Sequence, residues 1–131
     1  MRYLLDTNAV ISLLKDDSPA LAGRVRACSS GEIGLSSIVL HELYFGAFKS
    51  QKAERNLEVL DRLQFEIVPF GPEDARQAGR VRAELAKVGT PIGPYDALIA
   101  GQASERGLTL VTRNGKEFRR VKELRWEDWE S

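Results

Sequence analysis

Short apolar runs alternate with longer amphipathic stretches along this chain, a pattern typical of strands separated by helices. Capping signals and apolar stripes predict helices over residues 8–15, 19–29, 37–50, 51–63, 72–87 and 95–106. The apolar runs predict strands over residues 2–5, 33–35, 65–70, 108–112 and 124–126. Strands that alternate with helices are joined as parallel strands by right-handed crossovers, so we expect an α/β fold with a parallel sheet.

Local signals mark several of these boundaries. Ser18 followed by Pro19 predicts a helix start, because serine caps the free N–H groups and proline is tolerated in the first turn. Ser36 or Ser37 is expected to cap the next helix, over residues 37–50. Gly107 stands where a helix usually ends in a left-handed glycine.

Three acidic residues are expected to meet at one edge of the sheet. Ligands of parallel sheets bind outside the carboxyl ends of the strands. Asp6 and Thr112 follow two of these strands, and Asp96 lies in the first turn of a helix, which faces the same edge. Glu42 lies inside a helix with apolar neighbours, so we expect that helix to be buried on more than one side. Together the three carboxylates suggest a cage for Mg²⁺ or Mn²⁺, which prefer oxygen ligands and serve in phosphodiester cleavage.

Each acid also has an ordinary structural explanation. Asp6 is placed to cap the following helix, and Asp96 is stabilised by the helix dipole without any function. Glu42 is equally compatible with a solvated surface position. If the metal cage exists, Thr7 and Asn8 are expected to hold the Asp6 carboxylate by hydrogen bonds.

Further polar candidates follow the fourth strand. Thr112 and Asn114 are placed to orient a metal-bound water, and Arg113 is placed to contact phosphate. Glu117 is a possible additional acid, although we favour a surface position for it. His41 is the only histidine and points about 100° away from its acidic neighbour around the helix, so we expect it to be solvated or hydrogen-bonded rather than a ligand.

Composition narrows the class of protein. The 131 residues suit one domain over residues 1–131, and 19 basic side chains balance 19 acidic ones. Zero net charge argues against a strong non-specific nucleic-acid binder. Residues 113–125 are locally basic; charge alone favours a solvated mixed-charge surface there, with a phosphate-facing patch as the alternative.

Other features indicate a cytoplasmic protein. One cysteine, Cys28, leaves no internal disulfide or thiolate zinc site. No apolar run approaches the ~20 residues of a membrane span, and Asp6 interrupts the N-terminal run before a signal peptide can develop. The aromatic residues are expected to serve packing or subunit contacts; they are Tyr44, Phe45, Phe48, Trp126 and Trp129.

Ordered motifs give the chain a specific resemblance. They are Leu5-Asp6-Thr7-Asn8, residues 37–46 (SIVLHELYFG), residues 92–100 (IGPYDALIA), residues 110–114 (LVTRN) with Glu117-Phe118, and residues 124–129 (LRWEDW). In this order they resemble PIN-domain proteins and, among these, the VapC toxins of VapBC type II toxin–antitoxin modules. The resemblance covers essentially the whole chain.

The resemblance implies a PIN-like three-layer α/β/α fold with a central parallel sheet of four to five strands. It implies a Mg²⁺- or Mn²⁺-dependent endoribonuclease that cuts structured RNA in tRNA or ribosomal RNA loops, with Asp6, Glu42 and Asp96 as metal ligands. It also implies a homodimer and a VapB-type antitoxin whose complex binds operator DNA. The family often has a fourth acid where this chain has Asn114, so one-metal and two-metal chemistry both stay open.

Two other classes of function fit the residues less well. A phosphatase with Asp6 as nucleophile would need a second aspartate two residues on, where Asn8 stands, and a receiver domain would need an acid directly after the third strand, where the chain has none before Glu73. A degenerate RNA-binding module would usually have lost one of the three acids.

Overall fold

The computed structural model describes residues 1–130 and is built on one parallel sheet. Its strands are β1 (Tyr3–Leu5), β2 (Ile33–Ser36), β3 (Glu66–Val68), β4 (Thr109–Val111) and β5 (Arg125–Glu127). Its helices are α1 (Thr7–Lys15), α2 (Pro19–Ala27), α3 (Ser37–Lys49), α4 (Ala53–Asp61), α5 (Pro72–Lys87), α6 (Pro94–Arg106) and α7 (Gly115–Phe118). The expected α/β fold with four to five parallel strands is confirmed.

The order of the strands creates a crevice beside β1. The sheet runs β3-β2-β1-β4-β5, so the chain first moves from β1 toward one edge and later crosses back to the other. β1 and β4 are neighbours, with Leu5 beside Val111, and the Asp6 N–H donates to the Val111 carbonyl at 3.0 Å. Asp6 and Thr112 therefore leave the sheet side by side at the point where the strand order reverses, which is where ligands of such sheets bind.

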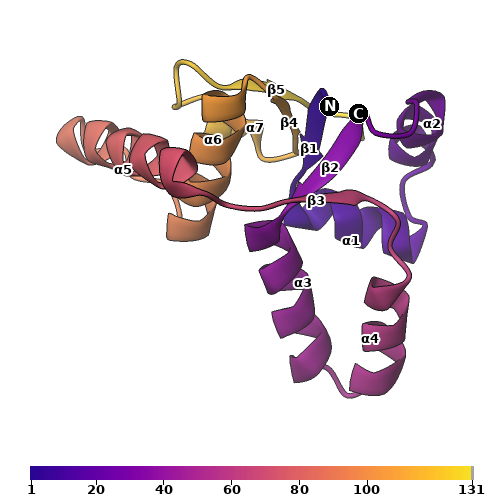
Figure 1. The fold of residues 1–131 in the computed structure, drawn as a ribbon. Coiled ribbons are helices and arrows are strands. Elements are labelled where there is room, and N and C mark those ends of the chain that lie inside the picture. The colour runs from indigo at the N-terminus through magenta and orange to yellow at the C-terminus, as the bar shows by residue number, and fades with distance from the viewer. Residues whose placement is uncertain (131) are drawn as a thin grey trace.

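Helices cover the sheet on both sides. Figure 1 shows α5 and α6 on one side of the strands and α1 and α2 on the other, while α3 and α4 form a hairpin that projects from the body. Because both faces are covered, the central strands are apolar throughout: Leu4, Leu5, Leu35, Leu110 and Val111 are all fully buried. In the part of the chain that the structure describes, no helix is long and apolar enough to cross a membrane.

The local signals in the sequence are mostly confirmed. Ser18 accepts a hydrogen bond from the Leu21 N–H, Ser36 accepts one from the Ile38 N–H, and Gly107 adopts a left-handed conformation with φ of 66°. The second and fourth helices are shorter than expected, and the four-residue helix α7 lies outside the helix ranges predicted from the sequence.

The aromatic residues divide into two groups. Trp129 is buried and packs edge-on against Tyr3, with ring centroids 4.8 Å apart, which confirms its packing role. Phe45 and Phe48, in contrast, are 61% and 68% exposed on α3. These two therefore do not belong to the core, and of the two expected roles only a contact surface is left for them.

The α5–α6 pair depends on one close approach and one buried ion pair. A Cβ on Gly101 of α6 would stand 2.6 Å from the Cβ and the N atom of Ala78 on α5, so only glycine allows the two helices to pack at this distance. Asp74 is buried between them. Burial raises its pKa, but the Arg106 guanidinium, bonded at 2.8 and 3.1 Å, and the Gly71 N–H more than offset this, so its pKa is lowered.

Replacing Gly101 by alanine should therefore destabilise the protein by about 2–3 kcal/mol, because the methyl group meets backbone that cannot move aside. Gly79 of α5 is the matched control. Among the described residues nothing lies within 4 Å of the position that its methyl group would take, and it is exposed, so Gly79→Ala should stabilise by about 0.5–1 kcal/mol. Urea unfolding monitored by circular dichroism measures both changes. Equal effects of the two substitutions would contradict the close packing.

Candidate active site

A cavity of about 130 Å³ opens at the carboxyl end of β1. It collects side chains from five elements: the end of β1, the start of α1, α3, α6, and α7 with its N-cap. Its lining residues are Asp6, Thr7, Asn8, Glu42, Asp96, Ile99, Asn114 and Phe118. The structure thus brings together all three acids that the sequence singled out, along with Asn114.

Asp6 is buried and serves both a helix end and the cavity. It is the N-cap of α1, and its Oδ1 accepts a hydrogen bond from the Ala9 N–H at 2.8 Å. Burial raises its pKa, the Thr112 hydroxyl and the Ala9 N–H lower it, and the charges of Glu130 and Glu42 raise it again, with a net increase. The capping role is confirmed, and the same carboxylate also lines the cavity.

Asp96 has the most perturbed carboxyl group of the cavity. Its pKa is raised to about 7, first by burial, then by a hydrogen bond and repulsion from Glu117, and then by repulsion from Glu42 and Asp6. Asp96 lies in the first turn of α6, after the N-cap Gly93, where a Cβ would stand 3.4 Å from the Asp96 Oδ2. Three neighbouring acids therefore act on one aspartate.

Glu42 is held by Thr7, which the sequence led us to expect as a hydrogen-bond donor to Asp6. The Thr7 hydroxyl donates to the Glu42 Oε1 at 2.9 Å, so the expectation that Thr7 holds Asp6 is wrong. The expectation that the helix is buried on more than one side is also wrong. Val39, Leu43 and Ala47 form a single buried stripe at four-residue spacing on α3.

Glu117 belongs to the site, contrary to the surface position that we favoured from the sequence. The Asn114 side-chain amide donates to the Glu117 Oε2 at 2.9 Å, and the Asn114 N–H donates to the Thr112 hydroxyl, also at 2.9 Å. Glu117 in turn shares a side-chain hydrogen bond with Asp96. An Asn followed three residues later by Glu is a helix-start signal, and it indicated that the two side chains face each other.

The remaining candidates lie at the rim or outside the cavity. Asn8 lines the cavity but is exposed, and Arg113 does not line it; the Arg113 Nη1 lies 3.9 Å from the Glu130 Oε1. His41 is exposed, with its ring 5.6 Å from that of Tyr95, in line with the solvated role expected for it.

The donor set of the cavity fits a hard divalent cation. Its lining contains three carboxylates, one hydroxyl and two amides, and neither lysine nor arginine is among the described residues that form it. Oxygen ligands of this kind suit Mg²⁺ and Mn²⁺. Among residues 1–130, however, no three acidic, histidine or cysteine side chains are grouped so that they hold an ion as they stand. A cation would therefore need the carboxylates to turn inward, and its charge would offset their mutual repulsion.

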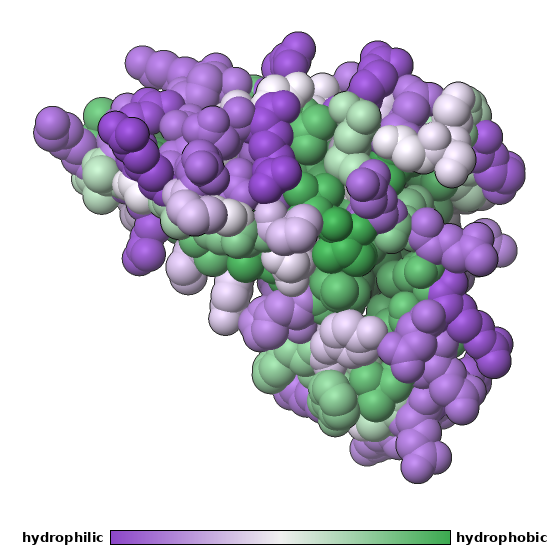
Figure 2. Space-filling view, in the orientation of Figure 1, coloured by the Kyte–Doolittle hydropathy of each residue, from purple (hydrophilic) through white to green (hydrophobic). Residues whose placement is uncertain are grey.

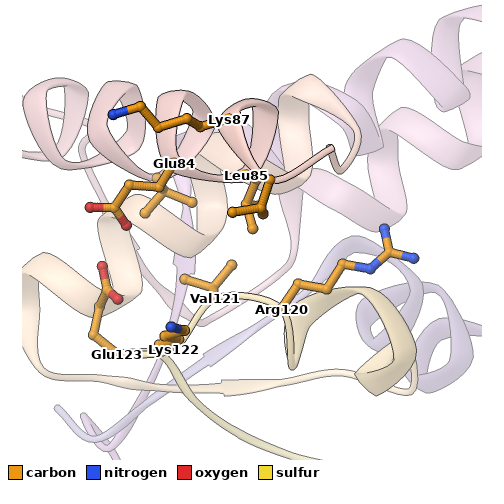
Figure 3. Close-up of a pocket in the computed structure, with 9 residues that line it drawn as sticks. Glu84, Leu85, Lys87, Arg120, Val121, Lys122 and Glu123 are labelled. Carbon is orange, nitrogen blue, oxygen red and sulfur yellow. The ribbon is translucent and has the colours of Figure 1, made fainter. Parts of the chain in front are cut away.

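A second cavity, of about 260 Å³, lies between α5 and the segment before β5 and has no comparable chemistry among its described residues. Figure 3 shows Leu85 and Val121 beside it, with Glu84 and Glu123 pointing toward each other. Both acids are neutralised by Arg80, which forms an ion pair with each of them. These acids are therefore engaged in surface ion pairs rather than free to act on a ligand.

Known proteins share this architecture. Residues 3–124 match the PIN domain. The chain is 41% identical to the tRNA(fMet)-specific endonuclease VapC of Shigella flexneri and 42% identical to that of Salmonella typhimurium, in each case over 98% of both chains. The chain belongs to the VapC family of PIN-domain ribonucleases.

The solved structures agree with this assignment to the VapC family. The fold superimposes with a TM-score of 0.93 on a chain of the DNA-bound VapBC crystal structure from Salmonella typhimurium, at 41% identity and 98% coverage of both chains. It superimposes with a TM-score of 0.90 on the promoter-bound VapBC2 of Rickettsia felis, at 36% identity. PIN-domain nucleases generally depend on a divalent metal, in line with the acidic cavity of this VapC family member.

The raised pKa of Asp96 makes a prediction about stability. Its pKa in the folded state is above 3.8, so ionisation of Asp96 opposes folding, and its contribution to stability is lost as pH rises from about 4 to about 7. Without metal, Asp96→Asn should therefore stabilise the protein at about pH 8, on the order of 1 kcal/mol, and this gain should shrink toward pH 4. Thermal unfolding in EDTA at several pH values measures it.

Glu105→Gln is the control for this experiment, since Glu105 is an exposed acid on the same helix. It should leave the melting temperature nearly unchanged at every pH. An Asp96→Asn protein that is less stable than wild type at about pH 8 would show that Asp96 is not in a repulsive cluster.

Proposed function

We propose that this protein is a toxin of the VapC type, an endoribonuclease that hydrolyses structured RNA at tRNA or ribosomal RNA loops with the help of Mg²⁺ or Mn²⁺. The observation that carries the proposal is the meeting of Asp6, Glu42 and Asp96 in one cavity at the reversal point of a PIN-domain sheet. Because its substrate would be RNA, we place the protein in the cytoplasm. We propose that residues 1–131 form one domain.

Asp6, Glu42 and Asp96 would hold the divalent cation. When bound, such a cation neutralises charge on the scissile phosphate and lowers the pKa of an attacking water. The chain's own residues would do the rest: Thr7 fixes one oxygen of Glu42, and Asn114 fixes Glu117 against Asp96. We propose Asp96 as the group that accepts the proton of the attacking water; the cation would favour its carboxylate form, which burial and the neighbouring acids disfavour in the metal-free protein.

The amide of Asn114 cannot supply a fourth negative charge, but Glu117 stands beside it. We propose that Glu117 provides this charge when a cation displaces the proton that it shares with Asp96, with Asn114 as its positioning residue. Thr112 holds the turn that presents Asn114 and bonds to Asp6 as well. This is the role we propose for the segment after β4.

Relatives that are 41–42% identical are named for cleavage of tRNA(fMet), so tRNA is the first substrate to test. Purified protein should cut tRNA at one or a few loop positions with Mg²⁺ or Mn²⁺ and not with EDTA. Asp6→Asn should lower the cleavage rate at least about 100-fold, since the metal ligand is lost while asparagine still caps α1. End sequencing of total tRNA and ribosomal RNA maps the cuts.

Asp16→Asn is the matched control for this change. Asp16 is exposed at the end of α1 with φ of 54°, a left-handed conformation that asparagine also adopts readily. This variant should cleave RNA like wild type. Wild-type protein that binds tRNA but never cuts it, with Asp6→Asn binding equally well, would instead favour the degenerate RNA-binding module.

A partner protein has a suitable groove next to the cavity. This apolar groove, of about 630 Å³, lies between α1, α3 and α4 and adjoins the catalytic cavity at Glu42, which lines both. Figure 2 shows apolar side chains gathered on this face, from the body of the molecule onto the α3–α4 hairpin. Its apolar walls include Ile11, Leu14 and Val59. We propose that the C-terminal segment of a VapB-type antitoxin occupies it and covers the acids.

The assembly we propose follows the relatives. Crystal structures of VapBC complexes, two of them bound to DNA, contain chains that match this one over 98% or more of its length. We therefore propose a homodimer that joins a VapB-type antitoxin, and a complex that binds operator DNA. Phe45 and Phe48 are exposed apolar side chains of the kind that such contacts use.

Placing charge in the groove should separate inhibition from catalysis. Leu14→Lys with Val59→Lys should weaken antitoxin binding at least about tenfold, because a charged side chain cannot enter an apolar contact without losing its hydration. RNA cleavage by the free toxin should stay within about twofold, since neither residue lines the catalytic cavity. Titration of cleavage with antitoxin measures both.

Val88→Lys is the control for the groove. Val88 is 70% exposed at the end of α5 and does not line the groove. Its substitution should change neither cleavage nor inhibition, and a groove variant that is still inhibited at the wild-type antitoxin concentration would exclude this groove.

A further inference from the structure

A polar cleft adjoins the catalytic cavity between α1 and the turn after β4. The cleft measures about 460 Å³, and two residues line both spaces, Asn8 and Asn114. Its other lining residues are Ile11, Ser12, Lys15, Asp17 and Arg113. The two spaces are therefore continuous, and a chain that leaves the cavity past the two amides enters the cleft.

The cleft supplies the positive charge that the cavity lacks. Within residues 1–130, no lysine or arginine lines the cavity, where three carboxylates gather, whereas Lys15 and Arg113 line the cleft against one acid, Asp17. The Arg113 side chain is 68% exposed, and its distance of 3.9 Å from Glu130 is at the outer limit of an ion pair. Its guanidinium is thus available to a ligand.

A polyanionic substrate needs a positively charged surface beside the acidic cavity. The acidic cavity repels every phosphate of an RNA chain except the one at the reacting position, so the neighbouring phosphate requires a cation close by. Amides and a hydroxyl on the same walls, from Asn8, Ser12 and Asn114, are donors and acceptors suited to ribose and base edges.

We propose that this cleft binds the nucleotide next to the scissile bond, with its phosphate held by Lys15 and Arg113. The inference rests on the proposed RNA cleavage and adds to it the path of the substrate. The two cations are positioning residues for the RNA chain and take no part in the bond-breaking step. An acidic protein segment is the rival occupant, and the polar walls and the opening into the catalytic cavity favour RNA over it.

The test compares charge removal inside and outside the cleft. Lys15→Gln and Arg113→Gln are set against Lys116→Gln and Arg119→Gln, two exposed cations nearby that do not line the cleft. All four side chains are exposed, so each variant should fold like wild type, which circular dichroism checks. Binding of the cleavable tRNA is measured at several salt concentrations in an Asp6→Asn background, and cleavage is measured in protein that retains Asp6.

Each cleft substitution should weaken RNA binding about tenfold and raise KM by a similar factor, with kcat changed much less. The slope of log Kd against log salt should fall by about 0.7 for each phosphate of single-stranded RNA that is no longer neutralised. The two control substitutions should leave both the slope and KM close to wild type.

Other outcomes overturn the proposal in distinguishable ways. If wild type cleaves RNA but the cleft variants keep its KM and salt slope, the cleft is not the RNA path, while the proposed function stands. If the cleft variants keep RNA binding but lose antitoxin binding, the occupant is an acidic protein segment. If wild type neither binds nor cuts any RNA, both the cleft assignment and the proposed function fall.

Discussion

Mutual repulsion among the carboxylates that line the cavity is the constraint on which the site depends. Asp6, Glu42 and Asp96 line one small cavity, and the charges around Asp96 help to raise its pKa to about 7. Such an arrangement is unfavourable in a metal-free protein, and it persists because rigid elements supply the acids: the end of a central strand, the inside of a helix and the first turn of another. A divalent cation, on which PIN-domain nucleases generally depend, would relieve this repulsion.

The sheet makes this arrangement possible without strain in the backbone. β1 and β4 are neighbours although more than a hundred residues separate them in the chain, and the bond from the Asp6 N–H to the Val111 carbonyl fixes the two strand ends together. The crossover from β3 to β4, which contains α5 and α6, spans the sheet to achieve this. The close packing of Gly101 against Ala78, five residues along α6 from Asp96, therefore helps to set where Asp96 stands.

The sequence was sufficient for features with a local cause. Ser18, Ser36 and Gly107 are helix boundaries that neighbouring atoms decide, and the motifs around Asp6 and Asp96 identified the family and the acids. It was insufficient where the partner is distant in the chain. Nothing near Thr7 indicates that its hydroxyl binds Glu42, 35 residues away, and the exposure of Phe45 follows from the projection of the α3–α4 hairpin. Glu117 was predictable only in part: the local spacing of Asn114 and Glu117 indicated their contact, but nothing in the sequence indicated the hydrogen bond from Glu117 to Asp96.

Three spaces of different character meet at the cavity, and their order explains how one small surface can serve two partners. The apolar groove reaches the acids through Glu42, and the polar cleft reaches them through Asn8 and Asn114. Ile11 and Lys15 of α1 line both the groove and the cleft. On the proposals above, a protein segment that fills the groove and extends past α1 would compete with RNA for Lys15, so inhibition would not require the antitoxin to distort the acids. Occupation of the groove and the cleft beside the acids would be enough to keep RNA out.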